Sequence, residues 1–246
     1  MNALRALWRL GRALAHALSG LATIVLVFPG LDAAQREQRV QAWAQSMLAL
    51  LGIRLEVRGT PPARGPILLV ANHISWLDIL VIHAARHCRF VAKAEVRHWP
   101  LIGRLASGGG TLYIERESRR DALRVVHHMA DCLRAGDILA VFPEGTTSDG
   151  TGLLPFHANL LQAAVATGTP VQPVGLRFSD CAEPVSQAAA YVGDTHLLRS
   201  LWSVVTAHGM RAQVTWLSPV DTGHVDRRLL AEGVRDQIRR AISVKS

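Results

Sequence analysis

The hydrophobic pattern divides the chain into an N-terminal helical part and a longer part in which strands and helices alternate. Residues 13–31 contain no Asp, Glu, Lys or Arg, and residues 32–52 carry apolar side chains along one side of a second expected helix. Beyond Gly52, residues 53–57 alternate between apolar and polar positions, as a half-buried strand does. We therefore expect two units: an N-terminal helical segment over residues 1–52 and an α/β domain over residues 53–246.

Short apolar runs in the second unit predict strands that are buried on both faces of a sheet. Residues 67–71 and 138–142 are the clearest runs of this kind. Further strands are expected over residues 89–92, 111–114, 171–178 and 212–217, and helices over residues 77–86, 94–105 (interrupted at Pro100), 119–134, 158–167 and 226–242. This alternation predicts an α/β fold with a mixed, largely parallel central sheet flanked by helices. In such sheets ligands bind beyond the carboxyl ends of the strands.

The N-terminal segment has the features of a membrane-associated pair of helices. Arg5, Arg9 and Arg12 precede the apolar stretch, which is interrupted by His16 and by Pro29-Gly30. About 20 apolar residues are needed to cross a bilayer, so a hairpin lying in one leaflet fits the pattern as well as a span does. A buried helix of a soluble fold is a third possibility, whereas a signal peptide is disfavoured because no convincing cleavage site follows. The flanking arginines favour the cytoplasmic face of the inner membrane, where anionic lipids attract them.

The basic balance of the chain narrows the choice of partners. There are 27 Lys and Arg against 19 Asp and Glu, a net charge of +8, which suits either nucleic acid or an anionic lipid surface. Only 5% of residues are aromatic and no nucleic-acid-binding motif is present, so we expect an anionic membrane lipid and no nucleic acid as partner. The three cysteines are far apart, which suggests reduced cytoplasmic thiols, and no His and Cys spacing predicts a metal site.

The first candidate motif is Asn72-His-Ile-Ser-Trp-Leu-Asp78, which directly follows the run 67–71. On a regular helix a five-residue spacing is about 140° around the axis, so His73 and Asp78 would not share a face. If His73 lies in the turn and Asp78 in the first helical turn, the carboxylate can fold back onto the ring and leave the other ring nitrogen as a general base. A substrate hydroxyl can then be the nucleophile. A lone His near an Asp is more often structural, so this motif needs the support of others.

The second candidate motif, Gly110-Thr-Leu-Tyr-Ile-Glu-Arg116, ends just past an expected strand. The guanidinium of Arg116 can clamp a phosphate through two parallel hydrogen bonds. Taken alone, a surface arginine paired with Glu115 or Glu117 is the more common arrangement.

The third candidate motif is Phe142-Pro-Glu-Gly-Thr-Thr-Ser148, which leaves the run 138–142. Gly145 permits a turn that is open to a ligand. Exposed N–H groups of that turn, with the hydroxyls of Thr146 and Thr147, can bind an oxyanion or a phosphate. Glu144 can hold an acceptor hydroxyl or Arg116. A generic glycine turn is the alternative, and the sequence is not a Walker loop.

Together these motifs resemble the ordered blocks of the glycerolipid acyltransferase family over about residues 50–220. The blocks are Asn72-His-x4-Asp78, Tyr113-Ile-Glu-Arg116, Phe142-Pro-Glu-Gly145 and Val171-Gln-Pro-Val174. The best-known bacterial members are 1-acylglycerol-3-phosphate acyltransferases, and the N-terminal hairpin is similar to the one they carry. One departure is Glu115, where the family often has Asp or Asn before the arginine.

The resemblance implies a role for each matching residue. It makes His73 the base that deprotonates the acceptor hydroxyl and Asp78 the residue that orients it. It makes Arg116, Glu144 and Gly145 the binding site for the phosphorylated acceptor. Lys93 lies in a stretch similar to the family's lysine-containing segment and is a further phosphate candidate.

We therefore expect a membrane-associated O-acyltransferase of phospholipid biosynthesis that needs no cofactor. It would move a fatty acyl group from acyl-CoA or acyl carrier protein to the sn-2 hydroxyl of lysophosphatidate, a lysophospholipid acceptor. Another lyso-lipid, such as lyso-ornithine lipid, is the alternative acceptor. A hydrolase is disfavoured because no GxSxG elbow is present. A basic membrane-binding lipid carrier is the non-enzyme alternative, and it would have no need of a general base.

Overall fold

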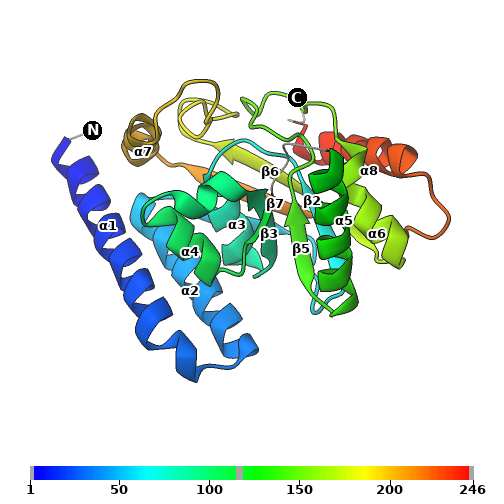
Figure 1. Cartoon of the computed structure of the whole chain (residues 1–246). Coiled ribbons are helices and arrows are strands. Elements are labelled where there is room, and N and C mark those ends of the chain that lie inside the picture. The colour runs from blue at the N-terminus through cyan, green and yellow to red at the C-terminus, as the bar shows by residue number, and fades with distance from the viewer. Residues whose placement is uncertain (1–2, 115–118, 244–246) are drawn as a thin grey trace.

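The central sheet forms from the short apolar runs. The structure is a computed structural model, and it describes residues 3–114 and 119–243 (Figure 1). Its strands are β1 (Arg54–Arg58), β2 (Ile67–Ala71), β3 (Arg89–Lys93), β4 (Leu112–Ile114), β5 (Ile138–Val141), β6 (Val171–Ser179) and β7 (Arg211–Trp216). The described strands make one seven-stranded sheet in the order β1-β7-β6-β2-β5-β3-β4. Strands β4, β3, β5, β2 and β6 are parallel, whereas β7 is antiparallel to β6 and β1 is parallel to β7. The predicted mixed, largely parallel sheet is confirmed.

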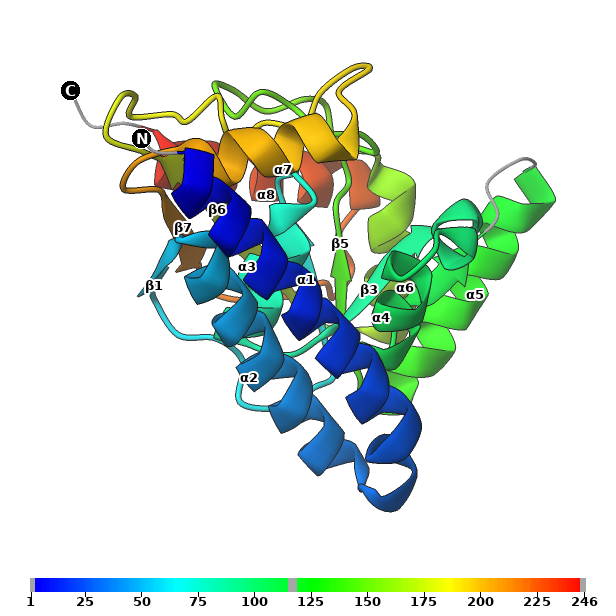
Figure 2. The same cartoon turned by 90° about the vertical axis from the view of Figure 1, so that its left-hand side faces the viewer.

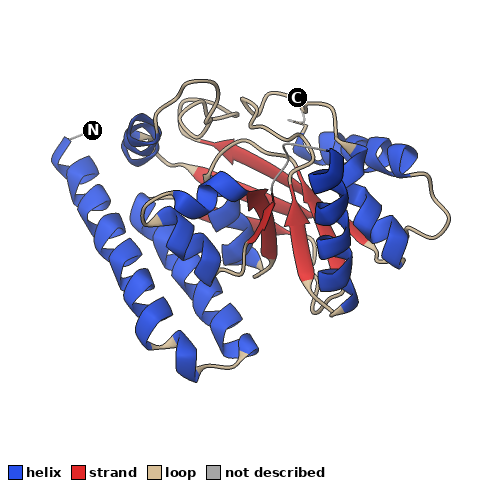
Figure 3. Cartoon of the chain, in the orientation of Figure 1, coloured by secondary structure: helices blue, strands red, loops and turns tan. Residues whose placement is uncertain are grey.

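Helices cover both faces of this sheet (Figure 3). They are α1 (Ala3–Leu26), α2 (Ala33–Leu51), α3 (Leu77–Ala85), α4 (Ile102–Gly108), α5 (Arg119–Arg134), α6 (Gln162–Thr167), α7 (Leu197–Thr206) and α8 (Arg227–Ile242), with short 3-10 turns η1 (Phe28–Gly30), η2 (Ala94–His98) and η3 (Ala158–Leu161). Successive residues of a strand point to opposite faces. Leu69 of β2 accordingly joins a core with α1, α2, α3 and α7, whereas Leu68 and Val70 join a second core with α5, α6 and α8. This explains why β2 is apolar at every position.

Helices α1 and α2 form a hairpin that packs onto the α/β part (Figure 2). Asp32 and Gln35 form a capping box at the start of α2. Met47 and Leu48 of α2 are buried in the same core as α3, and the Arg9 guanidinium donates a hydrogen bond of 2.9 Å to the carbonyl oxygen of Val205 in α7. No helix in the described part of the chain combines the length and apolarity needed to cross a bilayer. In space, residues on both sides of position 52 share a core. The division of the chain into two units at residue 52 therefore stays a prediction from the sequence.

Helix α7 lies in a segment for which the sequence predicts no helix. Its N-cap residue, His196, makes no capping hydrogen bond through its side chain, so the usual start signal is missing. Tertiary contacts hold the helix instead. The indole N–H of Trp76 donates a hydrogen bond of 3.0 Å to the hydroxyl of Ser200, and Val204 and Val205 are buried in the core shared with α1. Helix α7 therefore covers the segment that follows β2.

Candidate active site

The candidate motifs follow strands whose carboxyl ends lie at one edge of the sheet, because these strands are parallel neighbours. Strands β2, β5, β3 and β4 lie side by side in that order. His73 follows the end of β2 and Phe142 follows the end of β5, while Lys93 ends β3 and Ile114 ends β4. Lys93 and Ile114 are also paired in the register of β3 and β4. The sequence prediction of a shared site at the carboxyl ends of the strands is consistent with this arrangement.

His73 and Asp78 are in direct contact. The Nδ1 atom of His73 lies 2.7 Å from Oδ2 of Asp78, whose side chain is fully buried. Helix α3 begins at Leu77, so His73 lies in the turn before it and Asp78 lies in its first turn. This placement brings the two side chains together in spite of their five-residue spacing, as expected from the sequence.

The carboxylate of Asp78 also organises the turn itself. Its Oδ2 accepts hydrogen bonds from the backbone N–H groups of Ile74 (2.7 Å) and Ser75 (2.9 Å). Because Nδ1 of His73 donates to the same oxygen, Nε2 carries the lone pair. In the described part of the chain no residue hydrogen-bonds to Nε2, and the His73 side chain is 20% exposed. The ring is therefore held in the tautomer that a general base requires.

The backbone and ring of His73 are held from three further directions. The ring stacks on Phe142, with 4.1 Å between centroids and 11° between planes. The carbonyl oxygen of His73 accepts hydrogen bonds from the N–H (2.8 Å) and the hydroxyl (3.1 Å) of Ser148. The N–H of His73 donates to the carboxylate of Glu144 at 2.8 Å. The first and third motifs are thus locked together around the imidazole.

The sequence led us to expect that Glu144 binds the acceptor, whereas in the structure its carboxylate bonds to two backbone N–H groups. Its Oε1 accepts the N–H of His73 and its Oε2 accepts the N–H of Leu154, both at 2.8 Å, and the side chain is buried. Burial raises the pKa of this carboxyl group, and the two backbone donors act in the opposite direction. Both oxygens already serve the protein backbone, so the geometry favours a residue that positions His73 over one that binds acceptor directly.

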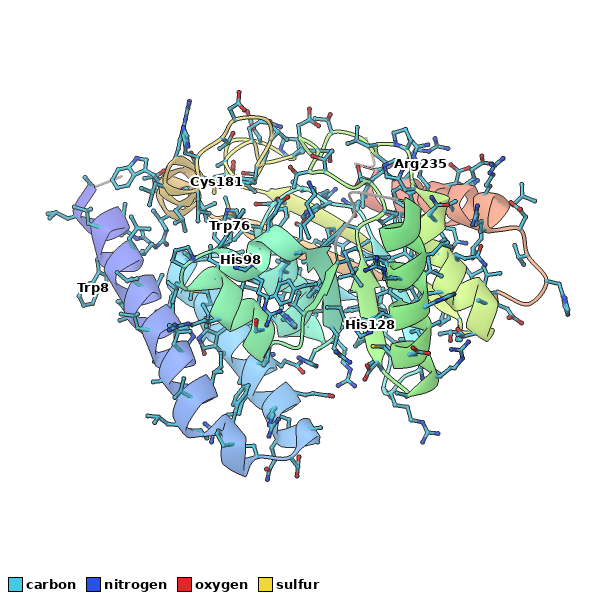
Figure 4. The ribbon with its side chains drawn as sticks, in the orientation of Figure 1. Trp8, Trp76, His98, His128, Cys181 and Arg235 are labelled. Carbon is cyan, nitrogen blue, oxygen red and sulfur yellow. The ribbon has the colours of Figure 1, made fainter. Side chains whose placement is uncertain are left out.

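Arg235 of α8 supports the same arrangement. In Figure 4 it lies at the opposite end of the molecule from Trp8. Its guanidinium donates to the carbonyl oxygens of Leu153 (2.7 Å) and Leu154 (2.9 Å). It therefore fixes the segment whose N–H holds Glu144. No motif in the sequence singled out Arg235, because its partners lie about 80 residues earlier in the chain.

The turn after β5 has the conformation that the glycine predicts. Gly145 has a φ of 72°, and its N–H donates to the carbonyl oxygen of Phe142 at 3.1 Å. The hydroxyl of Thr147 donates to the carbonyl oxygen of Tyr191, so it is committed to the fold. Thr146 is exposed, and its hydroxyl bonds to no residue that the structure describes. Of the two threonines expected to bind substrate, only Thr146 offers a free hydroxyl.

Of the two basic residues expected to bind phosphate, Lys93 and Arg116, the structure describes one. Lys93 is exposed at the end of β3, in the strand beside β5. Arg116 lies outside the described residues, two positions beyond the end of β4. The phosphate clamp expected at these residues stays a prediction.

The chain resembles acyltransferases in sequence and in fold. A family model described as Acyltransferase matches residues 54–177. The chain is 36% identical to a lyso-ornithine lipid O-acyltransferase of Pseudomonas aeruginosa, over 98% of this chain and 95% of that protein. It is 35% identical to a 1-acyl-sn-glycerol-3-phosphate acyltransferase of Neisseria gonorrhoeae, over 85% of this chain and 82% of that protein. It also shares its fold with the crystal structure of the 1-acyl-sn-glycerophosphate acyltransferase PlsC from Thermotoga maritima, with a TM-score of 0.65, 24% identity and coverage of 95% and 96%.

Proposed function

The chain belongs to the acyltransferase family, and we propose that it moves a fatty acyl group from a thioester donor to the hydroxyl of a lyso-lipid at a membrane surface. The observation that carries the proposal is the contact of 2.7 Å between Nδ1 of His73 and Oδ2 of Asp78, which leaves Nε2 as a base beyond the end of β2. The donor is acyl-CoA or acyl carrier protein. No cofactor or metal takes part in the proposed steps.

In the proposed reaction, Nε2 of His73 takes the proton of the acceptor hydroxyl as that oxygen attacks the thioester carbonyl. A tetrahedral intermediate forms and then collapses, so that the C–O ester bond replaces the C–S bond. The imidazolium returns its proton to the departing thiolate, and His73 is again neutral. Asp78 stabilises the imidazolium between these steps because its ionised carboxylate accepts from Nδ1.

We propose lysophosphatidate as the acceptor, with the sn-2 hydroxyl directed at His73. The basic candidates Lys93 and Arg116 and the Gly145–Thr146 turn support this choice, since they suit a phosphate. Lyso-ornithine lipid is the second candidate. It is favoured by the relative from Pseudomonas aeruginosa, which is similar over nearly the whole chain.

The surface of α1 supports docking on a membrane. This helix buries its small residues Ala6, Ala13 and Ala17 against the core and leaves most of its large apolar residues exposed. Trp8 projects from the outer side of α1 (Figure 4) and is 66% exposed. The other more than half-exposed apolar residues of α1 are Leu4, Leu7, Leu14, Leu18, Val25 and Leu26. A face of this composition, on a chain with a net charge of +8, suits the anionic cytoplasmic face of the inner membrane.

Thiol release from acyl-CoA, and then from acyl carrier protein, tests the proposal. We expect release that depends on an added lyso-lipid, and the comparison of lysophosphatidate with lyso-ornithine lipid identifies the acceptor. The His73→Ala variant should lose about 10²–10⁴-fold in rate while remaining folded. Release without any acceptor would indicate a hydrolase, and no release with either donor would indicate a lipid carrier; both results would contradict the proposal.

A further inference from the structure

An open groove of about 460 Å³ lies between α1 and the η2–α4 segment. Leu21, Ile24 and Val25 of α1 form its apolar wall, and Arg97 of η2 and Arg104 of α4 lie on the other side. None of the residues that line it belongs to the motifs that gather around His73. The groove is therefore distinct from the contacts around His73, but it borders the second motif, because the hydroxyl of Tyr113 donates to the carbonyl oxygen of Gly103 and lies 3.0 Å from the hydroxyl of Ser107.

Two close approaches of the backbone shape the groove. Arg97 and Arg104 lie on two short helices joined by a turn in which Leu101 has a φ of 64°, a strained value for leucine. A Cβ atom at Gly103 would lie 2.3 Å from the carbonyl oxygen of Arg97, and one at Gly108 would lie 2.3 Å from Cδ1 of Ile24. The glycines thus allow η2, α4 and α1 to pack closely enough to bring both arginines to the apolar wall.

Among the residues that the structure describes, no acidic side chain pairs with the charges in the groove. Arg97 and Arg104 are exposed, and neither has an acidic or hydrogen-bonding partner in residues 3–114 and 119–243. The apolar wall continues the exposed face of α1, because Leu18, Leu21 and Val25 follow one another at helical spacing and Val25 is 67% exposed. Figure 2 shows the C-terminal half of α1 beside α4. A ligand suited to this groove has an acyl chain for the wall and an anionic head for the arginines.

We propose that this groove holds an anionic phospholipid of the bilayer, with its phosphate between Arg97 and Arg104 and one acyl chain along Leu21, Ile24 and Val25. The lipid would be a resident of the membrane and not the acceptor, since the groove includes none of the residues around His73. The proposal rests on the proposed function of the chain at a membrane surface. It adds that the enzyme recognises an anionic lipid at a defined site, beyond the general attraction of its net charge.

Vesicle binding by the full-length protein tests the site directly. We would compare the wild type with the Arg97→Gln/Arg104→Gln variant on vesicles of phosphatidylcholine, with and without one quarter phosphatidylglycerol. Each arginine should contribute about fivefold to binding of the anionic vesicles, so loss of both should weaken that binding about 30-fold. Binding to vesicles of pure phosphatidylcholine should be unchanged.

A matched control removes the same net charge elsewhere. The Arg228→Gln/Arg240→Gln variant changes two exposed arginines of α8, on the opposite face of the sheet from α1. At physiological salt, charges further than about 8 Å from the membrane are largely screened, so this variant should bind as the wild type does. An equal loss in both variants would attribute binding to net charge alone and overturn the proposal, as would unchanged binding by the groove variant.

Two further measurements separate the bilayer lipid from other occupants. Monomeric dihexanoyl phosphatidylglycerol, studied by calorimetry, should bind the wild type at one site and the groove variant much more weakly, whereas glycerol 3-phosphate should not bind there. In neutral detergent the groove variant should keep the wild-type KM for lysophosphatidate; a raised KM would make the groove part of the acceptor site and overturn the proposal. If the wild type transferred no acyl group at all, the proposed function would fail while the vesicle result stayed interpretable.

Discussion

The role of Glu144 can be tested with the Glu144→Gln variant, in which an NH2 group replaces one carboxylate oxygen. The native carboxylate accepts the N–H of His73 and the N–H of Leu154 with separate oxygens. A glutamine has a single carbonyl oxygen, so whichever way its amide is turned, its NH2 group faces one of the two backbone donors. The shape of the buried side chain is nearly unchanged, whereas its hydrogen bonding and its charge are altered.

The expected magnitude follows from this loss. A hydrogen bond to a charged acceptor contributes about 1.5–3 kcal/mol, and a buried donor left without a partner costs about 1–3 kcal/mol. These two terms describe the same broken contact and are not added, so we expect the free energy of unfolding to fall by about 2 kcal/mol. If the turn relaxes and displaces the imidazole of His73 by about 1 Å, kcat should fall about 100-fold.

Steady-state kinetics and urea unfolding measure both effects. A positioning role predicts a lower kcat with little change in the KM for the acceptor, because both oxygens of Glu144 bond to backbone N–H groups. For the unfolding measurement alone, Thr146→Val is a suitable comparison, since its exposed hydroxyl lies two positions away and stability should change by no more than about 0.5 kcal/mol. A tenfold rise in acceptor KM for Glu144→Gln, with kcat and stability unchanged, would refute the positioning role.

Three further results are expected. Asp78→Asn should lower the transfer rate at least about 100-fold, because an amide cannot hold His73 in the same tautomer, and the ring nitrogen shifts in an NMR spectrum would report the change. Burial lowers the pKa of His83 from 6.5 to about 3, so below pH 6.5 the unfolded chain binds a proton at this residue and the folded chain does not. The free energy of unfolding should therefore fall by on the order of 2 kcal/mol between pH 7.5 and pH 5. A His83→Gln variant whose stability fell equally with pH would contradict this assignment. Gly145→Ala should destabilise the protein by about 1–2 kcal/mol in thermal unfolding because of its positive φ, whereas Gly152→Ala, with open space around the added methyl group, should not.

The sheet was predictable because its signal is local. Each strand that is buried on both faces needs an unbroken apolar run, and β2 and β5 carry such runs at the predicted positions. The helix α5 has the predicted bounds for a similar reason, since its apolar side chains repeat at helical spacing. Helix α7 was missed because its start has no capping side chain, and contacts from Trp76 and the core hold it in place.

The sequence by itself determined which residues are the candidates for the chemistry. His73, Asp78, Glu144 and Gly145 follow apolar runs, and any sheet that buries those runs in parallel must bring their carboxyl ends to one edge. The uncharged stretch of residues 13–31 also indicated a helix near the N-terminus, and α1 covers Ala3–Leu26. Which side of that helix faces outward was decided by tertiary packing, because small residues such as Ala13 let α1 lie close to the core.

Only the tertiary structure decided how these residues work together. The contact between His73 and Asp78 depends on where the turn ends and α3 begins, and the partners of Glu144 depend on a backbone N–H ten residues further on. Arg235 reaches that same segment from the last helix of the chain. Such contacts join residues at irregular separations along the chain, so they leave no periodic pattern in the sequence. They exist only once the hydrophobic cores have fixed the elements relative to one another.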